Sequence, residues 1–213
     1  MAEIRAVVSD FGGVLTTPLM TAFLALQDEH GISPEHFAEA MGALREQYGE
    51  VPLYALERGE MTEGAFLEMM REVLEPVLGH RPELHRFRET FIGGLQPNPE
   101  MIELMAELGR SGLRMAMLTN NVREWEPLWR PMLPVDEIFE IVVDSAFVGC
   151  RKPEPRIYEL TIERLGLPAA ECLFVDDLEV NCEAARDAGM NAVHFRDNEQ
   201  AIAEIRGSVA AAG

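Results

Sequence analysis

Cysteine is scarce in this sequence, and so are basic residues. The 213 residues include three cysteines, an odd number without C-x-x-C spacing (Cys150, Cys172 and Cys182). We therefore expect small, free thiols, buried or half-buried, in a protein from a reducing compartment.

Long hydrophobic runs are also missing. No apolar run approaches the roughly 20 residues that a helix needs to span a bilayer. The N-terminus runs from Met1 directly into the strand-like segment Ile4–Val8, without a basic segment followed by an apolar one. These absences predict a cytoplasmic protein that does not cross a membrane.

Negative charge is in large excess. The chain has 18 basic and 37 acidic residues, which gives a formal net charge of −19. Such a surface repels nucleic-acid phosphates and anionic lipid, so we expect neither nucleic acid nor a membrane surface as a partner. An anionic substrate would require a local positive site, such as a metal ion or a well-placed lysine, to offset this field.

The residues that are present have an ordinary globular composition, with 47% apolar and 26% charged residues. The length suits one α/β domain with a modest insertion. Five short apolar or β-branched runs predict buried strands, at Ile4–Ser9, Arg114–Leu118, Ile141–Val143, Cys172–Val175 and Asn191–Phe195.

Helical patterns lie between these runs. One has Asn98 as a candidate N-cap and Gly109 or Gly112 as its end, and the others cover Pro153–Leu165 and Leu178–Ala188. Alternation of strands and helices predicts a parallel sheet with helices on both faces, which is a three-layer α/β/α arrangement.

Residues from about Pro18 to Phe91 interrupt the alternation, because they contain only helical patterns, one of them after the candidate N-cap Thr62. A helical block directly after the first strand predicts a cap over the carboxyl edge of the sheet. We therefore predict a core of residues 1–17 and 92–213 and a helical cap of residues 18–91. Gly207–Gly213 has the composition of a loose tail.

Polar residues follow four of the predicted strands, each group in a different loop. They are Asp10, Thr119-Asn120, Lys152 and Asp176-Asp177. Ligands of open α/β sheets bind outside the carboxyl ends of the strands. We therefore expect these residues to converge on one site.

The carboxylates suggest specific chemistry. Asp10 precedes Gly12-Gly13, whose freedom allows a tight turn that aims N–H groups at an anion, and an aspartate there can attack phosphorus. Its structural alternative is an Asx-turn. Asp176 and Asp177 repel each other unless a cation such as Mg²⁺ lies between them. Asp177 could also be the N-cap of the following helix, and both roles can coexist.

The remaining candidates each have a structural alternative. Thr119 could bind a phosphoryl oxygen or be an ordinary strand-end hydroxyl. Lys152 could neutralise the nucleophile and the phosphoryl charge or be a solvated lysine. Trp125 and Trp129 favour packing against the cap or a partner over substrate stacking. The five histidines show no ligand spacing, and we interpret them as surface or packing residues.

Four segments together resemble the haloacid dehalogenase superfamily. In chain order they are VVSDFGGVL, MLTNN, RKPEPRIYEL and LFVDDLEVNCEAARDAGM, and they span nearly the whole chain with the usual spacing. Within the superfamily the chain is similar to the N-terminal phosphatase domains of soluble epoxide hydrolases and to bacterial α-glucose-1-phosphate phosphatases, including the cap segment ERGEMTEGAF. The resemblance implies a Rossmann-like fold, and we predict the strand order 5-4-1-2-3.

The resemblance also implies roles for the candidate residues. The catalytic residues would be Asp10 and Lys152. The phosphate-binding residues would be Phe11, Gly12, Thr119, Asn120 and Lys152. The Mg²⁺ ligands would be Asp10, the backbone carbonyl of Gly12, Asp177 directly and Asp176 through water.

One position departs from the family pattern. Most phosphatases of the superfamily carry a second aspartate where this chain has Gly12, as general acid and base, and such help is worth about 10²–10⁴-fold in rate. Three explanations stay open. The leaving group is good enough alone, as with an anomeric sugar phosphate; a cap carboxylate, a histidine or the substrate supplies the proton; or the protein is a weak enzyme.

The sequence thus predicts a Mg²⁺-dependent phosphohydrolase that acts on a small phosphorylated metabolite, for example a sugar phosphate, through an aspartyl-phosphate on Asp10. One alternative is a metal-independent 2-haloacid dehalogenase, against which the adjacent Asp176 and Asp177 argue. Another is a weakly active or non-catalytic regulatory protein. The chain is expected to be a monomer or a homodimer.

Overall fold

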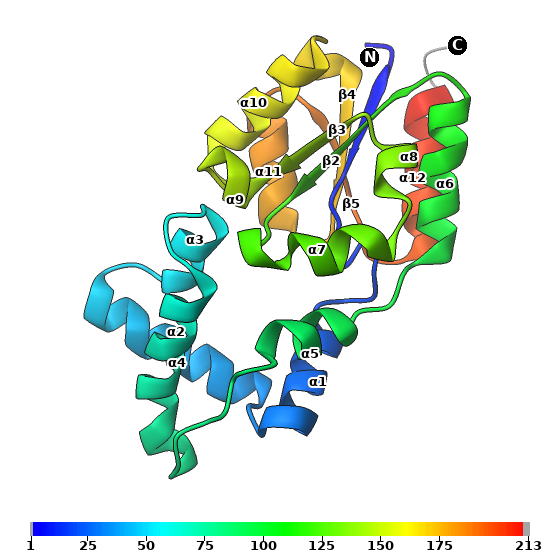
Figure 1. The fold of residues 1–213 in the computed structure, drawn as a ribbon. Coiled ribbons are helices and arrows are strands. Elements are labelled where there is room, and N and C mark those ends of the chain that lie inside the picture. The colour runs from blue at the N-terminus through cyan, green and yellow to red at the C-terminus, as the bar shows by residue number, and fades with distance from the viewer. Residues whose placement is uncertain (1, 211–213) are drawn as a thin grey trace.

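A five-stranded parallel sheet forms the centre of the molecule. The structure is a computed structural model that describes residues 2–210. Its strands are β1 (Ala6–Ser9), β2 (Arg114–Thr119), β3 (Ile141–Asp144), β4 (Cys172–Asp176) and β5 (Asn191–His194). The order β3-β2-β1-β4-β5 confirms the predicted order, read from the opposite edge (Figure 1).

Three of the strands end one residue later than the sequence predicts, each on a polar residue. Thr119, Asp144 and Asp176 are the last residues of β2, β3 and β4. Thr119 pairs with Asp144, and Asp176 pairs with His194. The backbone of these polar residues is therefore held by the sheet, although their side chains lie at its carboxyl edge.

Helices cover both faces of the sheet, which confirms the predicted three-layer arrangement. One face is covered by α10 (Pro155–Leu165) and α11 (Glu179–Asp187), and the other by α6 (Pro99–Arg110) and α12 (Asn198–Ala210) (Figure 1). Alternation along the central strand β1 explains the two cores, because Ala6 and Val8 pack into one and Val7 into the other.

One predicted helix start is wrong, and at a second, which is correct, the predicted cap residue makes no capping hydrogen bond. Pro153 lies outside α10, because a turn in which Glu154 N–H donates to the Arg151 carbonyl (2.7 Å) precedes the helix. Asn98 precedes α6, but its side chain makes no capping hydrogen bond. Its amide instead donates to the carbonyl of Val14 and to Asn198 Oδ1, and so joins three distant segments of the core.

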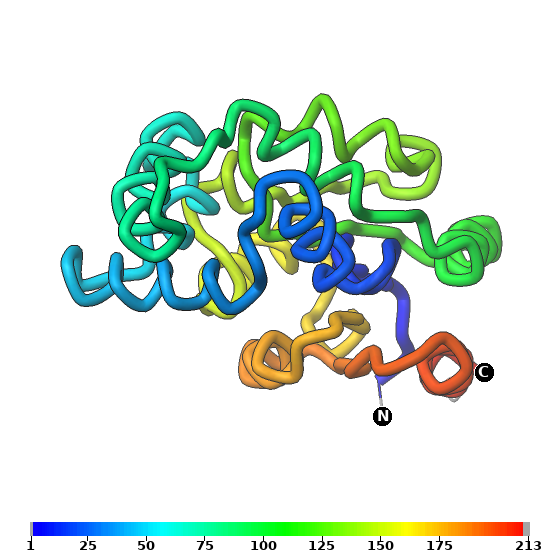
Figure 2. Tube along the Cα trace, turned by 90° about the horizontal axis from the view of Figure 1, so that it is seen from below, coloured from blue at the N-terminus to red at the C-terminus, as the bar shows by residue number. Residues whose placement is uncertain are grey.

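The helical insertion contains α1 (Met20–His30), α2 (Pro34–Tyr48), α3 (Pro52–Glu57), α4 (Glu63–Leu78) and α5 (Phe87–Gly93). Thr62 caps α4 as predicted, since its side chain accepts from Ala65 N–H. Figures 1 and 2 both place α1 beside α5, with which it packs. Helix α5 crosses the predicted cap boundary at Phe91, so a boundary there would fall inside a helix.

A run of short elements follows β2 and connects the core to this insertion. They are η1 (Arg123–Trp125), α7 (Glu126–Trp129), η2 (Arg130–Met132) and α8 (Val135–Ile138); α9 (Ser145–Val148) and η3 (Ala169–Glu171) come later in the chain. Trp129 is fully buried, with its ring 5.2 Å from that of Phe11. Trp125 packs against Phe91 of α5, also at 5.2 Å.

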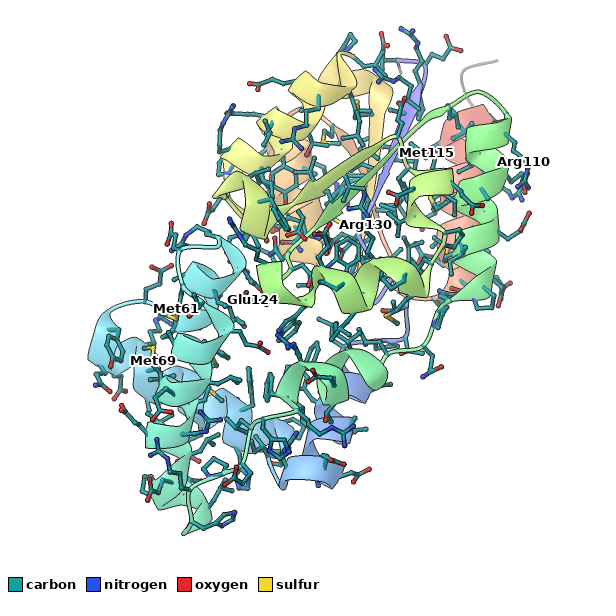
Figure 3. The ribbon with its side chains drawn as sticks, in the orientation of Figure 1. Met61, Met69, Arg110, Met115, Glu124 and Arg130 are labelled. Carbon is teal, nitrogen blue, oxygen red and sulfur yellow. The ribbon has the colours of Figure 1, made fainter. Side chains whose placement is uncertain are left out.

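Glu63 strengthens this connection from the start of α4. Its carboxylate accepts a hydrogen bond from Trp125 Nε1 (2.9 Å) and pairs with Arg88 (3.0 Å). Its backbone N–H donates to Glu124, which extends from η1 toward α4 (Figure 3). The packing of Trp125 against the predicted cap is therefore confirmed.

Two compositional predictions can be compared with the fold. The three cysteines are free and buried, as expected. Within residues 2–210, none of the helices combines the length and the apolar character needed to cross a membrane.

Gly59, just after α3, provides a test of the contact between the insertion and the core. It has φ +68°, and a side chain there would collide with the backbone carbonyl of Ala146 in α9. We expect Gly59→Ala to lower the free energy of unfolding by more than the 1–2 kcal/mol or so that left-handed backbone alone costs. Urea unfolding would measure the loss.

Gly79 is the matched control. It has φ +74° at the end of α4, but a side chain there would meet nothing within 4 Å. Gly79→Ala should therefore show only the backbone cost, and equal losses for the two variants would mean that the contact near Ala146 is not tight.

Candidate active site

The predicted residues meet at the carboxyl edge of the sheet. Asp10 directly follows β1, Asp176 ends β4, and Lys152 reaches them from the loop between α9 and α10. Lys152 Nζ lies 2.7 Å from Asp10 Oδ1 and 2.6 Å from Asp176 Oδ2. All three residues are buried, with exposures of 7% for Asp10, 2% for Lys152 and 0% for Asp176.

Lys152 is the only lysine in the chain, since every other basic residue counted in the net charge is an arginine. Because Lys152 is buried, the alternative of a solvated surface lysine is wrong. Burial by itself lowers the pKa of Lys152, but Asp10 and Asp176 outweigh it, so the pKa is raised and the side chain carries its positive charge.

Asn120 holds the backbone of this lysine. Its side-chain oxygen accepts from Lys152 N–H (2.8 Å), and its amide nitrogen donates to the Lys152 carbonyl (3.0 Å). Asn120 also lines the cavity described below, and its role in a phosphate pocket stays a prediction. Its side chain, however, is committed to Lys152 and contributes by fixing the loop.

One of the two carboxylate oxygens of Asp10 has partners within the protein. Its Oδ1 accepts from Phe11 N–H (2.7 Å) and contacts Lys152, so Oδ2 is the oxygen left for a substrate. Phe11 is a predicted phosphate-binding residue, but its N–H donates to Asp10 in this structure. Burial, with smaller contributions from Asp176 and Asp177, raises the pKa of Asp10 to about 8 although Lys152 opposes it. The ionised form of Asp10 is therefore disfavoured even beside Lys152, and a further cation would favour it.

Asp176 and Asp177 have different surroundings. Both oxygens of Asp176 have partners: Oδ1 accepts from Leu178 N–H and from Asn181 Nδ2, both at 2.9 Å, and Oδ2 accepts from Lys152 Nζ. Asp177 is not the N-cap of α11: that position is Leu178, and the carboxylate that accepts the nearby N–H belongs to Asp176.

The Asp177 carboxylate instead lies against the turn after β1. Gly13 has φ +80°, and any side chain on it would collide with Asp177 Oδ2. Glycine is thus required there both by the left-handed backbone and by the close approach. Burial raises the pKa of Asp177 to about 6, with Asp176 adding to the effect.

These three aspartates could hold a metal ion. One carboxylate oxygen from each of Asp10, Asp176 and Asp177 lies within 4.8 Å of the others. Hard carboxylate oxygens suit a hard divalent cation such as Mg²⁺. Three carboxylates near a single ammonium group also leave net negative charge at a largely buried place, which such a cation would offset.

A cavity of about 190 Å³ opens above Asp10 and Lys152. Gly12 and Thr119 line it with the residues already described. Thr119 is buried, and the one hydrogen bond of its hydroxyl found within residues 2–210 is a long one of 3.5 Å to the Asn120 carbonyl. The hydroxyl is therefore available to a ligand.

Sequence reasoning missed an ion pair at the edge of this cavity. Arg151 Nε lies 2.5 Å from Glu57 Oε2 of α3, and its guanidinium group stacks 4.0 Å from the ring centre of Tyr54. Arg151 directly precedes Lys152, so the pair connects α3 to the loop that carries Lys152. The only sequence signal was the position of Arg151 next to a candidate residue.

Two supporting residues were also missed. Asn181 orients Asp176 from the first turn of α11, five residues further along the chain. His194, which pairs with Asp176 across the sheet, places Nε2 3.0 Å from the Asp177 carbonyl. Both lie beside the aspartates only because β4, α11 and β5 pack together.

Comparison with known proteins accounts for this arrangement. A model of the haloacid dehalogenase-like hydrolases matches residues 4–189. The chain belongs to this family. In an alignment of 216 positions, the hydrolase is 27% identical to the rat bifunctional epoxide hydrolase 2. The alignment covers 95% of this chain but 38% of that longer protein. It is 33% identical to a sesquiterpene phosphatase of Aspergillus oryzae over 127 residues, 56% of this chain and 61% of that one.

Solved structures share the fold of the hydrolase. A HAD family enzyme of Bacteroides thetaiotaomicron, BT-2542, has a TM-score of 0.65 at 21% identity, covering 92% of this chain and 95% of that one. The L-2-haloacid dehalogenase RSc1362 also has a TM-score of 0.65, at 22% identity, covering 90% and 86%. The family model that matches the chain is that of a hydrolase.

Removing the ammonium group of Lys152 tests the electrostatics of the site. In metal-free hydrolase we expect Lys152→Met to cost about 3–5 kcal/mol at pH 8, because buried carboxylates lose their counter-charge. Without the lysine their pKa values rise further above the unfolded values. The folded protein then keeps protons that the unfolded chain releases, so the variant loses stability as the pH rises. Urea unfolding at pH 5 and pH 8 in EDTA should show a smaller loss at pH 5.

The double variant Lys152→Met/Asp176→Asn removes one charge of each sign. It should recover part of the stability lost at pH 8. A loss that is the same at both pH values and unchanged in the double variant would mean that packing, not charge, explains the effect.

Proposed function

We propose that this hydrolase is a Mg²⁺-dependent phosphatase that forms an aspartyl-phosphate on Asp10. The observation that carries the proposal is the placement of Asp10 at the base of a cavity, with Lys152 on one oxygen and two further carboxylates within 4.8 Å. This arrangement supplies a nucleophile, a fixed positive charge and a cation site together.

In the proposed reaction, Asp10 Oδ2 attacks phosphorus while the bond from phosphorus to the ester oxygen breaks. The alcohol leaves with a proton, and water then attacks the aspartyl-phosphate to release phosphate and restore Asp10. Lys152 and the Thr119 hydroxyl would hold the phosphoryl oxygens and stabilise their charge. Mg²⁺, held by Asp10, Asp177, the Gly12 carbonyl and, through water, Asp176, would supply further positive charge for the phosphoryl group.

The phosphatase interpretation is preferred to a dehalogenase because of Asp177. A metal-free attack on carbon has no use for a third carboxylate beside Asp10 and Asp176, and the partial burial of Asp177, which raises its pKa, costs free energy. Relatives named as phosphatases, including the sesquiterpene phosphatase and a glyceraldehyde 3-phosphate phosphatase of Methanopyrus kandleri, support the same choice. BT-2542 has been crystallised with magnesium and inorganic phosphate.

The proton for the leaving alcohol needs a source other than residue 12. Glu57 is the carboxylate of the predicted cap that lines the cavity, and burial raises its pKa although Arg151 opposes the shift. A raised pKa is the direction that a general acid requires. We propose Glu57 as the group of this chain that delivers the proton to poor leaving groups.

The first test is phosphate release from a panel of phosphomonoesters, with Mg²⁺ or with EDTA. We expect release that depends on Mg²⁺ and disappears in Asp10→Asn, because the amide cannot form the acyl-phosphate. Mg²⁺ binding without release from any compound would support the regulatory alternative. Chloride release from a 2-haloacid in EDTA would support the dehalogenase.

A second test restores the aspartate at position 12. A side-chain carbon there would lie 3.0 Å from Leu19 Cδ2, the end of a side chain that is 38% exposed and free to move. We expect Gly12→Asp, combined with Leu19→Ala to make room, to raise kcat for alkyl phosphates by about tenfold or more, and that for aryl phosphates less.

Two variants serve as controls for this test. Leu19→Ala alone separates the effect of space from that of the carboxylate. Glu57→Gln should have the opposite effect to the new aspartate and slow alkyl phosphates more than aryl phosphates. Unchanged alkyl phosphate kinetics in both Gly12→Asp/Leu19→Ala and Glu57→Gln would contradict the need for a proton donor.

A further inference from the structure

The cavity wall away from the strand ends is apolar and rich in aromatic rings. The ring-bearing residues are Phe23, Phe37, Phe66, Phe87, Phe91 and Trp125. All of these except Phe66 form one connected group of rings, in which the ring centre of Phe91 lies 5.2 Å from that of Trp125 and 5.4 Å from that of Phe23. The part of a substrate that extends beyond its phosphate would therefore meet ring surfaces.

The polar side chains elsewhere in the cavity lining largely bond to one another or to the backbone. The amide of Asn120 binds the Lys152 backbone, and that of Asn181 binds Asp176. Glu57 and Arg151 pair with each other. A sugar bound here would exchange its water contacts for carbon surfaces and leave buried hydroxyls without partners, which costs binding free energy.

The size of the cavity also points to an apolar ligand. Its volume of about 190 Å³ exceeds that of an apolar protein cavity of about 150 Å³ that stays dry and binds benzene. Protein interiors normally contain few voids larger than a water molecule. A cavity of this size, lined by rings and open to Asp10, fits a hydrophobic group.

On the basis of the phosphatase function proposed above, we propose that the substrates are monophosphate esters of apolar alcohols, with an alkyl or aromatic group of about six carbons or more. The phosphate would face Asp10 and Lys152, and the apolar group would lie among the rings. This substrate class differs from the sugar phosphate that the sequence suggested. The lack of a general acid at Gly12 concerns the leaving group and says nothing about the cavity wall far from the phosphate.

The experiment compares ethyl, hexyl and decyl phosphate with glucose 1-phosphate in Mg²⁺, below the concentrations at which the esters aggregate. We expect kcat/KM to rise by about fourfold per methylene until the cavity is filled. Hexyl phosphate should then exceed ethyl phosphate by on the order of a hundredfold and should also exceed glucose 1-phosphate.

A pair of variants tests whether the rings cause this preference. Phe91→Leu and Phe91→Asn introduce side chains of similar size and different polarity. The hexyl-to-ethyl ratio of kcat/KM should fall about tenfold further in Phe91→Asn than in Phe91→Leu. Phe139→Leu, at a buried ring of the core that does not line the cavity, should keep the ratio.

Binding of hexylphosphonate and ethylphosphonate, measured by calorimetry in Mg²⁺, separates the two proposals. Turnover that prefers glucose 1-phosphate, or ignores chain length, would overturn the substrate class and leave the phosphatase function intact. Absence of turnover with tighter binding of hexylphosphonate would overturn the phosphatase function and support the apolar ligand class. Absence of both turnover and a chain-length effect on binding would overturn both.

Discussion

The ammonium group of Lys152, buried between the carboxylates of Asp10 and Asp176, is the interaction on which the rest of the site depends. Removing three charged groups from water costs free energy, and their mutual attraction offsets this cost only when the geometry is accurate. That geometry follows from the neighbouring positions of β1 and β4 in the sheet, together with Asn120 on the lysine backbone and Asn181 on Asp176. The supporting amides are therefore as much a requirement of the site as the charges.

This interaction also explains how so acidic a chain could bind an anion. The net charge is −19, and the arginines of the surface are largely paired with carboxylates, as Arg206 is with Glu107 and Arg156 with Glu163. Positive charge that can act on a substrate is thus concentrated at the base of the cavity. The third carboxylate, Asp177, would allow a bound cation to increase this positive charge.

The core and the helical insertion contribute different properties. The strand ends supply the charged groups, whereas the insertion supplies most of the aromatic wall. Arg151 connects the two, since it pairs with Glu57 beside the cavity and directly precedes Lys152. A ligand that moved α3 would therefore act on the same loop that positions the Lys152 ammonium group.

The sequence by itself determined the strands, their order and the residues at their carboxyl ends, because these depend on local apolar runs, on turn glycines and on motifs whose spacing reflects one topology. It could not decide how side chains at the site are used. Asn120 supports Lys152, Asp176 rather than Asp177 accepts the N–H near the start of α11, and Asn98 joins core segments without capping its helix. The apolar character of the cavity was equally hidden, because its rings come from segments separated by up to about a hundred residues, and phenylalanines in an amphipathic helix have the same pattern whether they fill a core or line a cavity. Only the packing of those helices over the sheet distinguishes the two.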